Sequence, residues 1–193
     1  MPRSLLDDAD LAAVRTAARR RGGVGAVPVA CLMEGGALAH DPTDPQWADR
    51  DRLLVSGTSW RVAVTAALVD AGYTGGAGQV PVDGGRGLAV AAGAAAVAEL
   101  DGAGARVYCL LDADALDEGL TWEGALAGAR APALTAIVLV APSAVGRARR
   151  LFATAGWRTA VGAADDPVEV LGAFDLAHAD DDRAGAALTV TAG

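Results

Sequence analysis

Apolar runs alternate with mixed stretches along the second half of the chain, and this alternation predicts strands and helices in turn. The apolar runs predict strands at residues 106–111, 134–140, 158–161 and 187–191. The stretches between them predict helices at residues 118–130, 145–155 and 167–176. Continuous apolar strands that alternate with helices are typical of a parallel sheet with helices on both faces.

The first half of the chain adds further elements to this series. We expect helices at residues 7–21, 27–38, 60–71 and 84–100, and a strand at residues 53–55. The first of these helices has Asp residues near its start and Arg residues at its end, as the helix macrodipole favours. Residues 40–45 read HDPTDP and predict a turn, because two prolines there would interrupt a helix. Residues 73–78 predict a loop.

The expected order of elements also predicts where a ligand would bind. A chain of 193 residues suits one domain with a substantial core, and we interpret residues 1–193 as a single α/β domain. In a parallel sheet of this kind, ligands bind beyond the carboxyl ends of the strands. The loops after Leu111 and Val140 are therefore the expected binding edge.

Composition and charge exclude several classes of function. The net charge is −8, which argues against a basic surface for nucleic acid. The two Arg clusters, at residues 19–21 and 147–150, are expected on solvated helix faces. No apolar run reaches the roughly 18 to 20 residues of a membrane span, and the first residues do not resemble a signal peptide. We therefore expect a soluble, cytoplasmic protein, with Cys31 and Cys109 as buried, reduced thiols.

Several segments resemble one family along nearly the whole chain. Residues 41–52 read DPTDPQWADRDR, which is very similar to the transketolase pattern NPNDPxWxDRDRF. Residues 110–123 read LLDADALDEGLTWE, against the family's LLGDGELxEGxxWEA. Shorter matches are Gly85–Leu88 against GxGL, Ala155–Trp157 against FGW, and residues 187–191 against the last strand. The chain thus resembles the N-terminal, diphosphate-binding domain of transketolase.

The resemblance implies a fold, a cofactor and a partner. The family binds thiamine diphosphate between two domains, and this domain holds the diphosphate through a divalent metal such as Mg²⁺. The other, pyrimidine-binding domain supplies a catalytic Glu. The resemblance ends where that domain would begin, so it implies a separate pyrimidine-binding subunit and a dimer of heterodimers. Glu118, Trp122 and Glu123 match positions at the contact between active sites, although carboxylates are also common at an exposed helix start.

The cofactor motifs depart from the family pattern. The family's Gly-Asp-Gly aligns with Asp112, Ala113 and Asp114, and its metal-binding Asn aligns with Ala141. An alanine side chain has no oxygen ligand for a hard cation. Glycines at the flanking positions and at Gly85 would let backbone N–H groups approach phosphate, but Asp112 and Asp114 place carboxylates there instead.

The family's substrate-side histidines are replaced as well. Its Gly-His-Pro-Gly motif aligns with residues 23–26, with Val24 in place of His. Its Ser-Lys-Gly-His motif aligns with residues 56–59, with Ser59 in place of His. Its third His-bearing loop is shortened to residues 72–82. We expect His40 to be a turn residue rather than a base.

Three functions remain open from the sequence. The first is a non-catalytic subunit of a split, transketolase-like thiamine diphosphate protein. The second is a working two-component ketol or acyl transferase, in which Asp112 or Asp114 holds the metal in a rebuilt site. The third is a non-catalytic module that binds another small ligand or serves a structural role.

Overall fold

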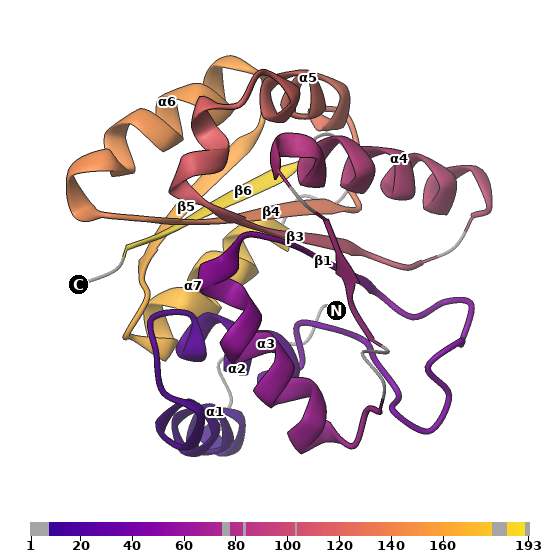
Figure 1. Cartoon of the computed structure of the whole chain (residues 1–193), viewed down its shortest axis with the longest axis vertical. Helices are drawn as coiled ribbons and strands as arrows, with labels where there is room; N and C mark the ends of the chain where they lie inside the picture. The colour runs from indigo at the N-terminus through magenta and orange to yellow at the C-terminus, as the bar shows by residue number, and fades with distance from the viewer. Residues whose placement is uncertain (1–7, 75–77, 83, 103, 179–184, 192–193) are drawn as a thin grey trace.

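Six strands form one parallel sheet at the centre of the molecule (Figure 1). The computed structural model describes residues 8–74, 78–82, 84–102, 104–178 and 185–191. The strands run β2–β1–β3–β4–β6–β5 across the sheet, and every neighbouring pair is parallel. Their bounds are β1 (Arg52–Ser56), β2 (Val80–Pro81), β3 (Val107–Asp112), β4 (Leu134–Val140), β5 (Arg158–Ala163) and β6 (Ala186–Thr191).

Helices cover both faces of this sheet, as the sequence predicted (Figure 1). One face carries α1 (Asp8–Arg21), α2 (Ala26–Met33), α3 (Thr58–Ala71) and α7 (Pro167–His178). The other face carries α4 (Gly87–Leu100), α5 (Gly119–Gly128) and α6 (Val145–Thr154). Among the described helices, none is both long and apolar enough to cross a membrane.

The central strands separate two apolar cores. Side chains of one strand alternate between the two faces of a sheet. Tyr108 and Leu110 of β3 pack in the core under α1, α2, α3 and α7, whereas Cys109 and Leu111 pack in the core under α4, α5 and α6. Cys31 and Cys109 are both buried and free, as predicted. Burial raises the pKa of the Cys109 thiol to about 12.

Several element bounds differ from the prediction. Helix α2 ends at Met33 rather than Leu38, because two glycines follow Glu34 and Gly36 takes a positive φ of 72°. A short 3₁₀-helix, Ala113–Asp117, precedes α5, and neither it nor the two-residue edge strand β2 was predicted. Such short elements leave no hydrophobic period in the sequence.

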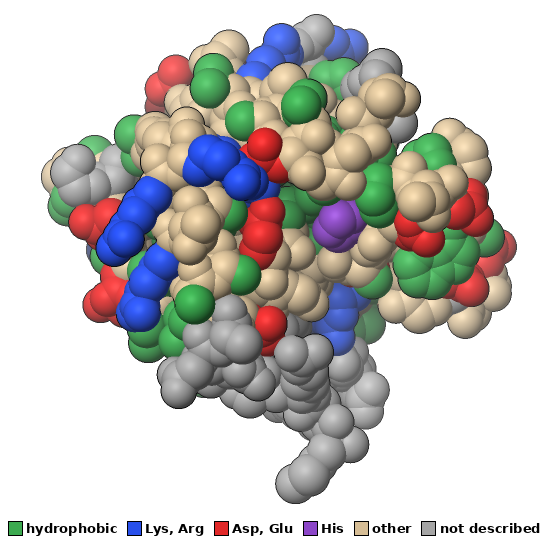
Figure 2. All heavy atoms as spheres, turned by 90° about the horizontal axis from the view of Figure 1, so that it is seen from below, with side chains coloured by type: hydrophobic (Ala, Val, Ile, Leu, Met, Phe, Trp, Pro, Cys, Tyr) green, Lys and Arg blue, Asp and Glu red, His purple; other side chains and the backbone are tan. Residues whose placement is uncertain are grey.

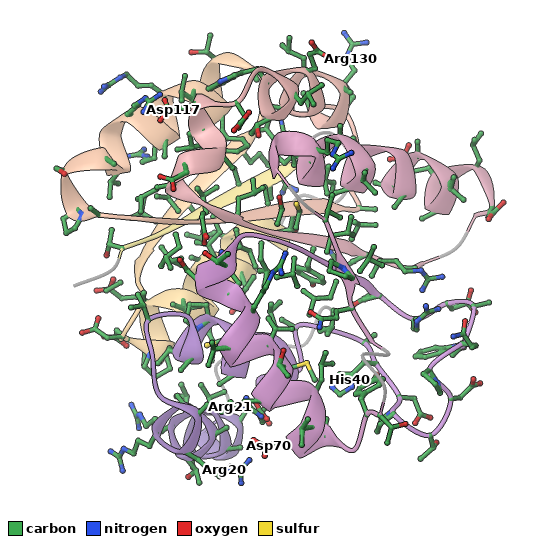
Figure 3. All side chains as sticks on the ribbon, in the orientation of Figure 1. Arg20, Arg21, His40, Asp70, Asp117 and Arg130 are labelled. Carbon is green, nitrogen blue, oxygen red and sulfur yellow. The ribbon has the colours of Figure 1, made fainter. Side chains whose placement is uncertain are left out.

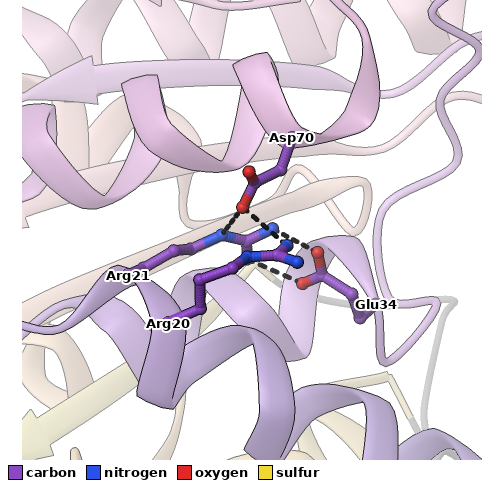
Figure 4. Close-up of polar contacts among 4 residues, drawn as sticks. All are labelled: Arg20, Arg21, Glu34 and Asp70. Carbon is purple, nitrogen blue, oxygen red and sulfur yellow. Dashed lines mark hydrogen bonds and ion pairs between the residues drawn. The ribbon is translucent and has the colours of Figure 1, made fainter.

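The prediction of a solvated face at residues 19–21 is wrong for Arg21. Its side chain is only 1% exposed, because α1, α2 and α3 converge on it. Its guanidinium donates to Glu34, the residue after α2, and, over 3.1 Å, to Asp70 of α3. Arg20 donates to the same Asp70 oxygen over 2.8 Å (Figures 3 and 4). The second cluster differs, because Arg149 and Arg150 are exposed as predicted.

Candidate functional site

The structure brings the predicted motif positions to one edge of the sheet. Strands β3 and β4 are parallel neighbours, with Asp112 in register with Leu139. Strand β3 therefore ends at Asp112, and Ala113 and Asp114 follow it at the edge where Ala141 follows β4. This is the carboxyl edge of the sheet, where parallel α/β proteins bind their ligands.

The Asp112 carboxylate is bound to the start of a helix. Its Oδ2 atom accepts a hydrogen bond of 3.1 Å from the backbone N–H of Ser59, in the first turn of α3. Its Oδ1 atom is buried and has no hydrogen-bond partner among the described residues. A Cβ atom at Gly57 would lie 2.4 Å from the Asp112 Cγ atom, so the glycine leaves room for the carboxylate.

The other metal-motif positions supply little that could bind a cation. Ala113 is half-buried and Ala141 is exposed, and both present only a methyl group. Asp114 is exposed, in the 3₁₀-helix after β3. Within the described part of the chain, no three His, Cys, Asp or Glu side chains lie together as metal ligands. Hard divalent cations take six or more oxygen ligands, so these residues do not fit a metal–diphosphate group.

The glycines before α4 have a packing role. A Cβ atom at Gly85 would lie 2.4 Å from the Cβ atom of Glu118, and one at Gly87 would lie 2.2 Å from the Cβ atom of Ser56. The hydroxyl of Thr121 also donates to the Gly85 carbonyl over 3.2 Å. These glycines let the start of α4 lie against the end of β1 and the start of α5.

The predicted interface residues lie around the start of α5. Glu118 and Glu123 are exposed, while the half-buried Trp122 donates from Nε1 to the Leu116 carbonyl over 3.1 Å. The same helix exposes two large apolar side chains, Leu120 and Leu126. A partner contact at this surface stays a prediction.

The segment most similar to the family motif has a structural role. The buried Asp51 carboxylate accepts backbone N–H groups of Ala39 over 2.7 Å and of Arg106 over 2.6 Å. Burial raises the pKa of Asp51, although these two hydrogen bonds oppose the shift. Arg52 donates to the carbonyls of Ala48 and Arg50. The motif therefore holds the loop before β1 against the start of β3.

The positions that match the family's histidines carry no titratable base. Val24 is exposed before α2, and Ser59 is exposed at the start of α3. His40 is half-buried, with a ring nitrogen 3.3 Å from the Tyr73 hydroxyl, and burial lowers the pKa of its imidazole. This contact keeps His40 in the loop before β1, as its interpretation as a turn residue predicted.

Comparisons with known proteins agree in sequence and in fold. No protein-family model matches the chain. A transketolase family protein of Sinorhizobium fredii is 31% identical over 114 residues, which cover 47% of this chain and 41% of that protein. Transketolase of Campylobacter jejuni superposes on 99% of this chain with a TM-score of 0.76 and 19% identity. Transketolase of Leishmania mexicana superposes on 96% with a TM-score of 0.76 and 20% identity.

The chain is similar in sequence to a transketolase family protein and has the fold of the matching part of transketolases. It spans 41% of the Sinorhizobium relative and 38% of the Campylobacter transketolase. The predicted α/β fold and the resemblance to transketolase are both confirmed.

The hydrogen bond between Asp112 and the start of α3 was not predicted from the sequence. Helix α3 begins after Gly57, which offers no capping side chain, and the pairing of Ser56 with Leu111 places Gly57 next to Asp112. The available signal was that Gly57 cannot cap α3 with a side chain, while Asp112 ends the strand beside it.

Proposed function

We propose that this transketolase-like domain is a non-catalytic subunit of a two-component assembly. In this proposal a separate pyrimidine-binding subunit pairs with it, as a dimer of heterodimers, and the domain contributes fold and contact surface rather than chemistry. The observation that carries the proposal is the Asp112 carboxylate, which takes a backbone N–H group of α3 at the edge where a diphosphate would lie.

Electrostatics support this proposal. A diphosphate at this edge would approach the carboxylates of Asp112 and Asp114. Two like charges about 4 Å apart repel by about 1 kcal/mol in water and about 4 kcal/mol at an effective dielectric of about 20. A divalent metal would offset the repulsion, but Ala113 and Ala141 bring it no oxygen ligand. Transketolases use thiamine diphosphate with a metal, and we infer that this domain binds neither.

The surface at the start of α5 supports the pairing. Glu118 and Glu123 are exposed there, and the same helix exposes Leu120 and Leu126. Exposed apolar side chains next to charged ones are common at protein interfaces. Trp122 stiffens this surface through its hydrogen bond to Leu116. We propose that this surface contacts the pyrimidine-binding subunit.

Light scattering tests the proposed pairing with a pyrimidine-binding subunit, and calorimetry tests the proposed lack of cofactor binding. Co-expression with a pyrimidine-binding subunit should give a stable complex, and the double variant E118R/E123R should weaken it at least tenfold. A matched double charge reversal in the loop before β1, D44R/D49R, should leave pairing intact. Thiamine diphosphate with Mg²⁺ should give no saturable heat with the domain alone. Failure of E118R/E123R to weaken the complex would remove the proposed surface.

The competing function is a working ketol or acyl transferase with a rebuilt metal site. That function requires tight, Mg²⁺-dependent thiamine diphosphate binding by the complex, lost in D112N or D114N. If the complex binds the cofactor in this way, the non-catalytic proposal is wrong. A variant that restores the family ligands, A113D/A141N, should recover little binding while Asp112 stays bound to α3. Adding D112G to that pair should recover more.

A further inference from the structure

A cavity lies on the α1, α2 and α7 side of the sheet, apart from the metal-motif positions, and it includes Gly23, Val24 and Ala26 of the segment that aligns with the family's Gly-His-Pro-Gly motif. Its volume is about 640 Å³, within the range of roughly 300–1,000 Å³ that is common for small-molecule sites. It is lined by α1, by the start of α2 and by the turn between β5 and α7. Residues 112–114 and 141 do not line it. Since β5 ends at Ala163, the cavity also opens at the carboxyl edge of the sheet.

One wall of this cavity carries two guanidinium groups. Arg15 and Arg19 lie four residues apart on α1, so they share a helix face. Neither makes an ion pair or a side-chain hydrogen bond with another described residue, whereas Arg20 and Arg21 of the same helix are bound to Asp70 and Glu34. Paired arginines of this kind suit a carboxylate or phosphate group.

The turn after β5 brings an acidic group to the same cavity. Asp165 is exposed there and makes no ion pair with Arg15 or Arg19 in the described structure. Its neighbour Asp166 differs, because its carboxylate accepts the Val168 backbone N–H over 2.8 Å at the start of α7. Asp165 is thus the acid of this turn that is free to accept a hydrogen bond from a ligand.

The surface between these charges is apolar. The remaining lining residues are small or aliphatic, namely Ala18, Gly23, Val24, Ala26, Val27, Ala164 and Pro167. Figure 2 views the molecule from the side of these helices, where arginine and acidic side chains gather near one another. The cavity therefore has positive, apolar and negative parts.

We propose that this cavity binds a small organic acid. The acid group lies between Arg15 and Arg19, the carbon skeleton lies against Val24 and Val27, and a hydrogen-bond donor at the far end reaches Asp165. That donor is a hydroxyl or an ammonium group, since a carboxylate only accepts hydrogen bonds. The proposal is independent of whether the domain holds a metal and a diphosphate, because residues 112–114 and 141 do not line the cavity.

Three four-carbon acids test the chemistry and distinguish the two donors. Butyrate, 4-hydroxybutyrate and 4-aminobutyrate differ only in their terminal group, and each is titrated into the whole chain while backbone amide resonances are followed. We expect saturable shifts at Gly23, Val24 and Asp165, with at least one polar-ended acid binding more tightly than butyrate. The double variant R15A/R19A should weaken binding at least tenfold. R149A/R150A, which removes two exposed arginines from α6, should change it less than twofold.

The same titrations contain the outcomes that overturn the proposal. No saturable shift with any of the three acids at 20 mM would show that the cavity is not an acid site. Equal weakening by R15A/R19A and R149A/R150A would show that only net charge matters. The variant D165A, which removes the acceptor oxygens, should reduce the preference for the polar-ended acids, and an unchanged preference would remove Asp165 from the site.

Discussion

The Asp112 carboxylate, at the end of β3, caps the N-terminus of α3, the helix that follows the neighbouring strand β1. Its Oδ2 atom accepts the Ser59 backbone N–H over 3.1 Å, and the parallel pairing of β1 with β3 brings the two residues together. Carboxylates are favoured at helix N-termini, where backbone N–H groups lack partners within the helix. The resemblance to transketolase implies a phosphate group at this edge of the sheet, and in this protein the Asp112 carboxylate lies there instead.

The close fit of Gly57 against Asp112 predicts coupled effects on stability. An alanine at position 57 would bring its Cβ atom within 2.4 Å of the Asp112 Cγ atom. We expect G57A to lower the free energy of unfolding by about 1–3 kcal/mol, as overpacking does, and D112A to lower it by about 1 kcal/mol through loss of the cap. In the D112A background, G57A should cost markedly less, as urea unfolding would measure.

A second glycine provides the control for this comparison of G57A, D112A and the double variant. Gly93 lies within α4, and a Cβ atom added there would meet open space. Since alanine is favoured over glycine within helices by roughly 0.5–1 kcal/mol, G93A should stabilise the protein in both backgrounds. Additive effects of G57A and D112A would contradict the contact between the two residues.

Arg21 is predicted to contribute far more to stability than its neighbour Arg20. Removing a buried partner leaves the opposite charges unpaired, which costs about 3–5 kcal/mol in fully buried networks. Glu34 and Asp70 are partly exposed, so we expect R21A to lower the free energy of unfolding by about 2–3 kcal/mol, less than the full value. R20A, whose side chain is 60% exposed, should cost less than about 1 kcal/mol. Similar urea midpoints for the two variants would be inconsistent with this network.

Asp51 is predicted to stabilise the loop before β1 through its two backbone hydrogen bonds. Asparagine has one acceptor oxygen, so D51N would leave an N–H group of Ala39 or Arg106 without its partner. An unsatisfied buried donor costs about 1–3 kcal/mol, which we expect as the loss in thermal or urea unfolding. The exposed neighbour Asp49 provides the control, because D49N should change stability by less than about 0.5 kcal/mol.

The ion pairs of Asp70 predict a dependence of stability on pH. Hydrogen bonds from Arg20 and Arg21 lower the pKa of the Asp70 carboxyl in the folded protein. Its contribution is therefore fully present above the unfolded pKa of about 3.9 and is lost as the pH falls through the lower, folded pKa. D70N should be less stable than the native protein at pH 6, and the difference should shrink below about pH 4. A difference that stays constant between pH 6 and pH 3 would rule out this contribution.

The pattern of apolar residues was enough to predict the class of fold. Buried runs such as 134–140 predicted central strands, and the helices between them required a parallel sheet, because a parallel connection needs a crossover. The motifs at 41–52 and 110–123 then indicated the resemblance to transketolase. The short strand β2 and the 3₁₀-helix after Asp112 were missed, since two to five residues carry no measurable period.

The candidate site was predicted only as a set of positions. The sequence alone showed that Ala113 and Ala141 lack metal ligands, because that conclusion depends on side-chain chemistry. Whether the Asp112 carboxylate faces a ligand or the protein depended on the register of β1 against β3, which sets Gly57 beside it. The burial of Arg21 among three helices, and the cavity between Arg15, Arg19 and Asp165, likewise depend on contacts between segments far apart in the chain. Local patterns carry no such distances, so tertiary packing alone defines these sites.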